Sequence, residues 1–204
     1  MRVVSIDVGI VNLAMAVMEG EGRREDLLVV DFCLVDITWM RHGRVPRREC
    51  RLCHGRSLTD RIDHFVQEQE PVLEEADHIL IEQQPPGGHQ AVEQLLFSRF
   101  RDRAVLVSPV GMHSHFCMRS LGYEERKRFV EERALLRLSS NEQKERLLSM
   151  ERRHDVCDAI CMADYWWAKK GSLSRPSATS PYFSTSSSDV SFDEYRFTGP
   201  QKGM

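Results

Sequence analysis

Three strand-like segments follow one another directly at the start of the chain, and they constrain the fold more than any other feature. Residues 2–8 alternate in the manner of a strand that faces a core, residues 12–18 form a second, and residues 27–37 a longer third, rich in Val and Leu. Gly9 and Gly20 supply turns between them. Three consecutive strands with short turns predict an antiparallel meander, which leaves the other edge of the first strand free to pair in parallel.

Helical and strand-like patterns alternate along the rest of the chain. In chain order, the patterns predict a helix at 58–73 that Pro71 should kink or restart, a strand at 78–82, a helix at 90–101, a strand at 104–108, and helices at 123–138, 142–150 and 155–168. Residues 109–120 are predicted as a loop, and residues 169–171 as the stop of the last helix. The order β-β-β-α-β-α-β-α is that of an RNase H-like α/β fold, a mixed five-stranded sheet flanked by helices, with the first strand central and the fourth beside it.

The composition predicts one folded domain and a tail. Residues 1–170 carry the periodic patterns, and 41% hydrophobic residues are enough for a core. Residues 39–56 interrupt these patterns as a polar loop insertion rich in Arg and Cys. Residues 171–204 are dominated by Ser, Thr and Pro, and we expect this tail to be disordered because it buries too little surface to offset its ordering entropy.

Four carboxylates lie where a surface role explains them poorly. Asp7 closes the first strand and Glu82 the fourth, where a charge is costly to bury without a partner. Asp155 and Asp158 are separated by about 300° around a helix and therefore share one face. Taken singly, Asp7 is explained as a turn cap, Glu82 as an exposed strand end and Asp155 as a helix cap. Together the acids favour a site for Mg²⁺ or Mn²⁺, because converging carboxylates repel each other without a cation.

A fifth acid on the same helix is excluded from this site. Asp164 falls about 180° around the helix from Asp155 and is predicted to face solvent. Tyr165, Trp166 and Trp167 follow it, and we expect them to pack in the core or at a dimer interface rather than to stack on nucleic-acid bases.

Three motifs, in this order, resemble the signature motifs of RuvC-like Holliday junction resolvases. They are SIDVGIVNLA at residues 5–14, IEQQP at 81–85 and DVCDA at 155–159. The likeness is greatest to the poxvirus-type and large-DNA-virus branch, which is similar to the mitochondrial fungal resolvases, and it extends over roughly residues 1–168. The insertion and the tail are not part of the general pattern of that family.

The resemblance implies a dimeric, Mg²⁺-dependent endonuclease that nicks opposed strands of a four-way DNA junction. It implies two metal ions, with Asp7 bridging both and Glu82, Asp155 and Asp158 completing their shells, and a water nucleophile that leaves a 5′ phosphate. The implied role is the resolution of branched or concatemeric DNA during replication and recombination. Two alternatives stay open, an RNase H that cuts RNA–DNA hybrids and a catalytically inactive module that binds junctions.

An ATPase of the actin or Hsp70 type is a further alternative, because residues 6–12 also resemble the first phosphate motif of those proteins. Such chains need a second Gly-rich phosphate loop and a duplicated domain. The 204 residues here contain neither, which disfavours this alternative.

A second metal site is suggested by a cluster of Cys and His residues, which resembles half of a zinc site. The candidate ligands are Cys50, Cys53 and His54, with His113 and His115 or Cys33 supplying the remainder. The alternatives are reduced surface cysteines or a disulfide at a dimer interface.

Several side chains are candidates for contacts with DNA. Gln83 and Gln84 follow Glu82 and could contact DNA through their amides, or could be ordinary polar loop residues. An Arg cluster in the insertion matches phosphate oxygens in its chemistry, and its candidate DNA ligands are Arg44, Arg47, Arg48 and Arg51. The run Arg126, Lys127 and Arg128 could track junction arms or form a solvated helix face. A net charge of −3 argues against a uniformly basic binder of nucleic acid.

The chain is expected to be intracellular. No stretch approaches the roughly 18 apolar residues of a membrane span, a strand pattern begins directly after Met1 in place of a signal peptide, and six irregularly spaced cysteines do not predict a secreted disulfide framework. If the chain is viral, its expected location is the site of viral DNA replication in the host cell.

Overall fold

The computed structural model describes residues 1–37 and 57–173 and contains a single five-stranded sheet in that part of the chain. The strands are β1 (Arg2–Asp7), β2 (Leu13–Glu19), β3 (Leu28–Val35), β4 (His78–Glu82) and β5 (Ala104–Val107). They lie in the order β3-β2-β1-β4-β5, with β1, β2 and β3 antiparallel and β4 and β5 parallel to β1. The predicted RNase H-like sheet, with its first strand central, is confirmed.

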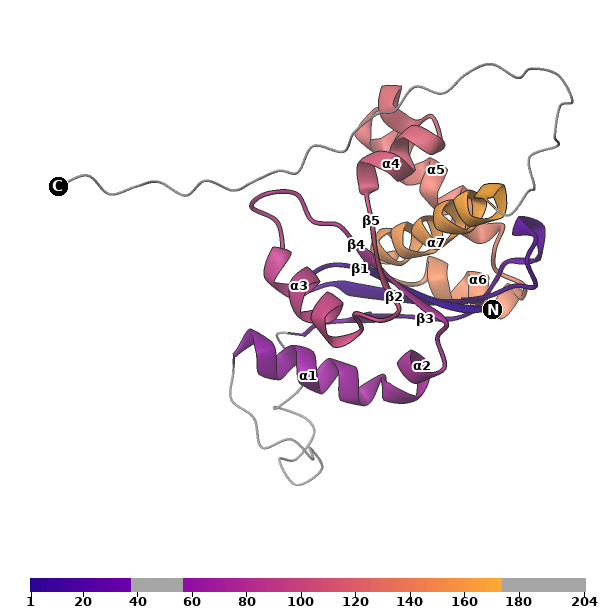
Figure 1. The fold of residues 1–204 in the computed structure, drawn as a ribbon. Coiled ribbons are helices and arrows are strands. Elements are labelled where there is room, and N and C mark those ends of the chain that lie inside the picture. Colours follow the sequence, from indigo (N-terminus) through magenta and orange to yellow (C-terminus); the bar gives the residue numbers. More distant parts are fainter. Residues whose placement is uncertain (38–56, 174–204) are drawn as a thin grey trace, which may run out of the picture.

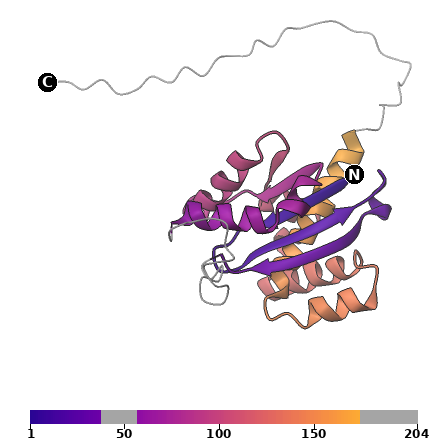
Figure 2. The ribbon, with the colours of Figure 1, turned by 90° about the horizontal axis from the view of Figure 1, so that it is seen from below.

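Helices cover both faces of the sheet (Figures 1 and 2). They are α1 (Leu58–Glu68), α2 (Glu70–Glu74), α3 (Gln90–Arg99), α4 (Pro109–His115), α5 (Tyr123–Leu135), α6 (Asn141–Leu148) and α7 (Arg153–Leu173), with short 3₁₀ turns η1 (Arg24–Asp26) and η2 (Met118–Ser120). Alternate residues of β1 point into two separate cores. Val3 packs with α5 and α7, whereas Val4 and Ile6 pack with α1 and α3.

The register of β1 and β4 brings the ends of these two strands together. Ile6 pairs with Ile81, so Asp7 and Glu82, one residue further on, lie side by side at the same edge of the sheet. The helix α7 packs on β1 and β2, and it begins near this edge. This arrangement positions the predicted acids.

The predicted loop at 109–120 is wrong, because its first part is the helix α4 and its later part includes η2. The Ser108 hydroxyl accepts a hydrogen bond from the Gly111 N–H (3.4 Å), and Pro109 occupies the first helical turn, where it is well tolerated. The buried side chain of Met112 anchors the helix to the core shared with α7.

Two predicted helix ends also change. The last helix does not stop at 169–171 but continues to Leu173, since one glycine costs a helix only about 1 kcal/mol and does not by itself end it. The helix predicted at 123–138 ends at Leu135, and the next residues pair with β3, where the Val29 N–H donates to the Arg137 carbonyl (2.9 Å). This isolated bridge covers the beginning of the outer edge of β3. Pro71 does restart the helix, since α2 begins at Glu70.

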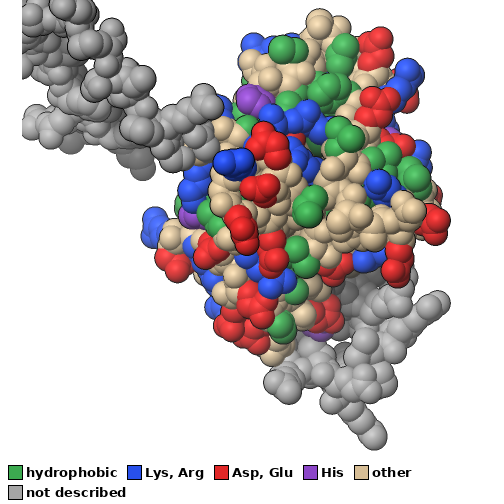
Figure 3. All heavy atoms as spheres, turned by 90° about the vertical axis from the view of Figure 1, so that its right-hand side faces the viewer, with side chains coloured by type: hydrophobic (Ala, Val, Ile, Leu, Met, Phe, Trp, Pro, Cys, Tyr) green, Lys and Arg blue, Asp and Glu red, His purple; other side chains and the backbone are tan. Residues whose placement is uncertain are grey.

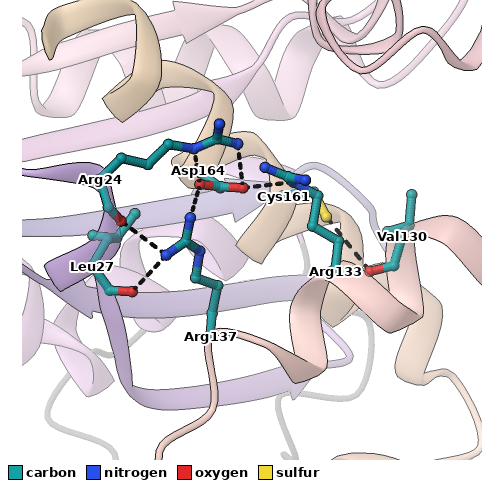
Figure 4. A network of polar contacts seen from close by, with 7 residues as sticks. All are labelled: Arg24, Leu27, Val130, Arg133, Arg137, Cys161 and Asp164. Atoms are coloured by element: carbon teal, nitrogen blue, oxygen red, sulfur yellow. Dashed lines mark hydrogen bonds and ion pairs between the residues drawn. The ribbon is translucent and has the colours of Figure 1, made fainter.

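The prediction that Asp164 faces solvent is wrong. Its side chain is fully buried and receives hydrogen bonds from three guanidinium groups, those of Arg24 (Nε, 2.8 Å), Arg133 (Nε, 2.6 Å) and Arg137 (Nη2, 2.7 Å) (Figure 4). Arg137 also donates to the backbone carbonyl of Arg24 (2.8 Å). The helical phase did separate Asp164 from the other acids, but α5 and η1 cover that face of α7.

The aromatic residues that follow Asp164 pack as predicted. Tyr165 and Trp167 are 7% and 2% exposed and belong to the core between α7 and the sheet. Trp166 is partly buried and lies against His78, with ring centroids 4.9 Å apart. Because they are buried, Tyr165 and Trp167 have no free ring face for stacking on bases.

Acidic and basic side chains are interspersed on the face shown in Figure 3, which lies at the right of Figure 1. That face therefore differs from the unbroken basic surface that a nucleic-acid backbone favours. None of the helices in the described part of the chain combines the length and the hydrophobicity of a transmembrane span.

Candidate active site

Three of the four predicted acids meet in one cavity. Asp7 and Glu82 enter it from the ends of β1 and β4, and Asp158 enters it from the first turns of α7. The cavity has a volume of about 170 Å³. Pro109, Met112 and His113 of α4 and Met162 of α7 complete its wall.

The fourth acid, Asp155, lines a second cavity of about 370 Å³ next to the first. Asp158 and His113 line both cavities, so the two are adjacent. The Arg152 guanidinium pairs with the Asp155 carboxylate, with Nε and Oδ2 3.0 Å apart. All four predicted acids thus lie in one region. Asp155 differs from the other three because it lines only the second cavity and pairs with Arg152.

One oxygen of Glu82 is held by two donors. The Gln84 side-chain amide donates to Oε2 (2.6 Å), and the Val8 backbone N–H donates to the same atom (3.3 Å). Gln84 is itself held, because its amide oxygen accepts from the His89 N–H (3.0 Å) and its backbone N–H donates to the buried carboxylate of Glu93. Glu82 therefore enters the cavity from a fixed position.

The acids repel one another strongly. Burial, followed by the charge of Glu82 and a hydrogen bond with that side chain, raises the pKa of Asp7 well above its usual value, with smaller effects from Asp158 and Asp155. Burial, Glu82 and Asp155 raise the pKa of Asp158 to about 7, against a smaller opposing effect of Lys127. Such a cluster is stabilised by bound cations, which reverse this repulsion.

The donor set fits a divalent cation of the Mg²⁺ class. Carboxylate oxygens are the ligands that Mg²⁺ and Mn²⁺ prefer. Within residues 1–37 and 57–173, no three His, Cys, Asp or Glu side chains are arranged closely enough to hold an ion as they stand. Two of the acids already have partners, because Asp7 shares a hydrogen bond with Glu82 and Asp155 accepts one from Arg152. Binding of an ion would require these two side chains to reorient.

The sequence of the chain matches the model of a known protein family. The family model described as "Poxvirus A22 protein" matches residues 1–170, which is most of the sequence. The chain belongs to the poxvirus A22 protein family. Among curated proteins, no sequence matches this family member at a significant level.

Solved structures share the fold of this poxvirus A22 family member. A fowlpox virus resolvase, solved in complex with Holliday junction DNA, is 12% identical with a TM-score of 0.58, over 83% of this chain and 99% of that one. The yeast mitochondrial Holliday junction resolvase Ydc2 is 16% identical (TM-score 0.60; 85% and 82% covered), and RuvC of Thermus thermophilus is 16% identical (0.51; 84% and 97%). At these identities the likeness shows the fold alone, which is the RNase H-like fold predicted from the sequence.

The A22 family member does not bring the predicted histidine pair together. His113 lines the acid cavity, whereas the His115 ring lies against Tyr165, with centroids 5.3 Å apart. Two residues apart on a helix means about 200° of rotation, so the two histidine side chains leave α4 on different sides. The alternative ligand Cys33 lies in β3 with a free thiol, whose pKa burial raises to about 11.

His113 is a site residue that the sequence reasoning placed elsewhere. The strand β5 runs parallel to β4 and ends at the same edge, so the helix that follows it must pass the acids. A prediction of a helix directly after β5 would have placed His113 beside the acids, because the parallel order of β4 and β5 leads the chain past them.

The remaining predicted residues have separate outcomes. Gln84 holds Glu82, while the side chain of Gln83 is exposed at the same edge. Seven candidates lie outside the described residues: Arg44, Arg47, Arg48, Arg51, Cys50, Cys53 and His54.

Proposed function

We propose that this chain is a structure-selective endonuclease that cuts four-way DNA junctions by metal-dependent hydrolysis of phosphodiester bonds. The observation that carries the proposal is the meeting of Asp7, Glu82 and Asp158 in one cavity at the ends of β1 and β4. Membership of the poxvirus A22 family and a fold shared with Holliday junction resolvases support the class of substrate.

The four acids would hold the cations, which we propose to be two Mg²⁺ or Mn²⁺ ions. Bound cations of this kind activate the attacking water and stabilise the leaving 3′ oxygen. Hydrolysis adds water across the P–O3′ bond, so the products carry a 5′ phosphate and a 3′ hydroxyl, which a ligase can rejoin.

The chain's own groups prepare the site for this chemistry. Gln84 and the Val8 N–H fix one oxygen of Glu82, so that this ligand is positioned before DNA arrives. Lys127 offsets part of the negative charge at Asp158. The side chains of Met112 and Met162 form an apolar part of the cavity wall beside the acids.

We propose that the active form is a homodimer. Each chain carries one acid cluster, and nicking two opposed strands of a junction requires two clusters. We place this activity, in recombination and in the processing of concatemers, at the site of viral DNA replication in the host cell.

The decisive experiment compares cleavage of a synthetic four-way junction with cleavage of linear duplex, flap and RNA–DNA hybrid, each in Mg²⁺ or Mn²⁺. We expect junction cleavage to dominate and Asp7→Asn to lower it about a thousandfold or more, equivalent to several kcal/mol of transition-state stabilisation. Junction binding should persist in this variant. Equal cutting of linear duplex would overturn the selectivity, preference for the hybrid would indicate an RNase H, and full activity of Asp7→Asn would overturn the site.

A further inference from the structure

The larger of the two cavities is lined mainly by the beginnings of α5 and α7. Its volume of about 370 Å³ lies in the range of small-ligand sites and is ample for one nucleotide. It shares Asp158 with the acid cavity, so whatever occupies it lies directly beside the proposed site of cleavage.

Three permanent cations line this cavity. They are Arg126 and Lys127 of α5 and Arg152, which precedes α7. The charge of Lys127 reaches Asp158 and offsets part of the rise in its pKa, and burial together with the charge of Arg126 lowers the pKa of His113. The cations therefore lie within electrostatic range of the acids, on the route by which a phosphate backbone would approach them.

An aromatic ring completes the wall. Tyr123, the first residue of α5, is 60% exposed, and the ammonium of Lys127 lies 4.3 Å from the centre of its ring. This cation–π contact orders the side chain on one face. An exposed, ordered ring beside cations is the combination that single-stranded nucleic acids use for stacking and backbone contact.

We propose that this cavity receives the nucleotide next to the scissile phosphate, with Arg126 and Lys127 on its phosphate and Tyr123 stacked on its base. This proposal rests on the proposed nuclease function and adds a strand-binding subsite to it. Arg152 remains paired with Asp155 in the wall of the cavity. The subsite binds an unpaired or distorted nucleotide best, because stacking on Tyr123 requires a base free of its neighbour.

The adjacent residue Arg128 provides a matched control. It belongs to the same run of basic residues on α5, but it is exposed and is not part of the cavity wall. A general effect of positive charge on DNA binding would be lost equally from all three positions, whereas a built subsite distinguishes Arg128 from its two neighbours.

The first test measures binding of a fluorescein-labelled four-way junction by anisotropy, in an Asp7→Asn background with Ca²⁺ and at several salt concentrations. We expect Arg126→Gln and Lys127→Gln, each made singly, to weaken binding at least tenfold more than Arg128→Gln. The slope of log Kobs against log salt should become shallower by about 1 in each of these two variants, because each lost phosphate contact removes roughly 0.9 from it. Equal losses in affinity and slope from Arg128→Gln would overturn the subsite.

The second test concerns the ring. Tyr123→Ala should weaken junction binding by about 5- to 100-fold, the range of one lost stacking contact, whereas Tyr123→Phe should bind like the parent. Thermal melting of each variant checks that it is folded. Identical binding by the Ala and Phe variants would overturn the stacking role. Failure of the nuclease proposal would appear differently, as a parent chain that neither cuts nor prefers junctions.

Discussion

Two acids on α7, Asp158 and Asp164, lie six residues apart in opposite electrostatic environments. Asp158 faces other carboxylates, and together with burial they raise its pKa to about 7. Asp164 is fully buried, yet three arginines donate to it. One face of the helix thus concentrates negative charges that nearby cations offset only in part, and the other surrounds a single negative charge with positive ones.

The difference separates a binding site from a structural junction. The repulsion around Asp158 is relieved when a proton or a cation binds, so these acids are arranged for a ligand at a cost to the free protein. The network around Asp164 is complete within the chain and ties η1, α5 and the segment after α5 to α7. We expect it to hold α5, with Arg126 and Lys127, in place beside the acids.

The largest effect expected from this comparison is on stability. Asp164→Asn removes the one negative charge that three partly buried guanidinium groups share, and should lower the free energy of unfolding by about 3–5 kcal/mol. For a domain of this size this corresponds to a fall in Tm of roughly 6–20 °C. Urea unfolding at pH 7.5 in EDTA measures it.

Asp158→Asn is the matched control on the same helix. Because it removes repulsion rather than attraction, it should leave the free energy of unfolding in EDTA unchanged or raise it. A similar loss from both substitutions would break the comparison, since it would mean that each acid merely fills space.

The next effect is a dependence on pH. The pKa of Asp158 is about 7 in the folded chain, against 3.8 as its ordinary value. Between these values the folded state retains a proton that the unfolded state has lost, so the free energy of unfolding falls as pH rises from about 4 to 7 and then levels off. We expect Asp158 to contribute about 4 kcal/mol to this fall in EDTA, because each unit of pKa difference corresponds to about 1.4 kcal/mol.

The contribution of Asp158 is isolated by subtracting the pH profile of Asp158→Asn from that of the parent. Saturating Mg²⁺ should shrink the difference, because a cation that binds the ionised acids stabilises the folded state at high pH. A difference profile that rises with pH would contradict this, because it would mean that basic side chains stabilise the ionised Asp158, as arginines do for Asp164.

The sequence was enough to predict the acid cluster that includes Asp158, but not the arginine network around Asp164. The strand patterns and the parallel pairing of β1 with β4 were enough to bring Asp7 next to Glu82. Helical phase separated Asp164 from the site, but phase cannot say what covers a helix face. Arg24, which donates to Asp164, is 140 residues distant from it in sequence, and only the packing of η1 on α7 brings the two side chains together.

The helix α4 was missed for a similar reason. Its sequence, PVGMHSH, combines Pro, Gly and Ser, which are typical of loops. Gly111 is required here by a neighbour, because a Cβ at this position would lie only 2.7 Å from the Tyr165 hydroxyl of α7. The glycine thus reflects a tertiary contact that local patterns do not contain, whereas the Ser108 cap followed by Pro109 is a local signal for a helix start.

The smallest predicted effect tests whether the acid site is positioned as firmly as the Asp164 network. Gln84→Ala removes the amide that holds Glu82 Oε2, and should weaken binding of Mn²⁺ by about 10- to 100-fold, as loss of such supporting partners does at other metal sites. Calorimetric titration of the free protein measures this without DNA. Gln83→Ala, at the exposed neighbouring position, should leave Mn²⁺ affinity unchanged. If both variants bind Mn²⁺ like the parent, Glu82 needs no support and the site is held by its strands alone.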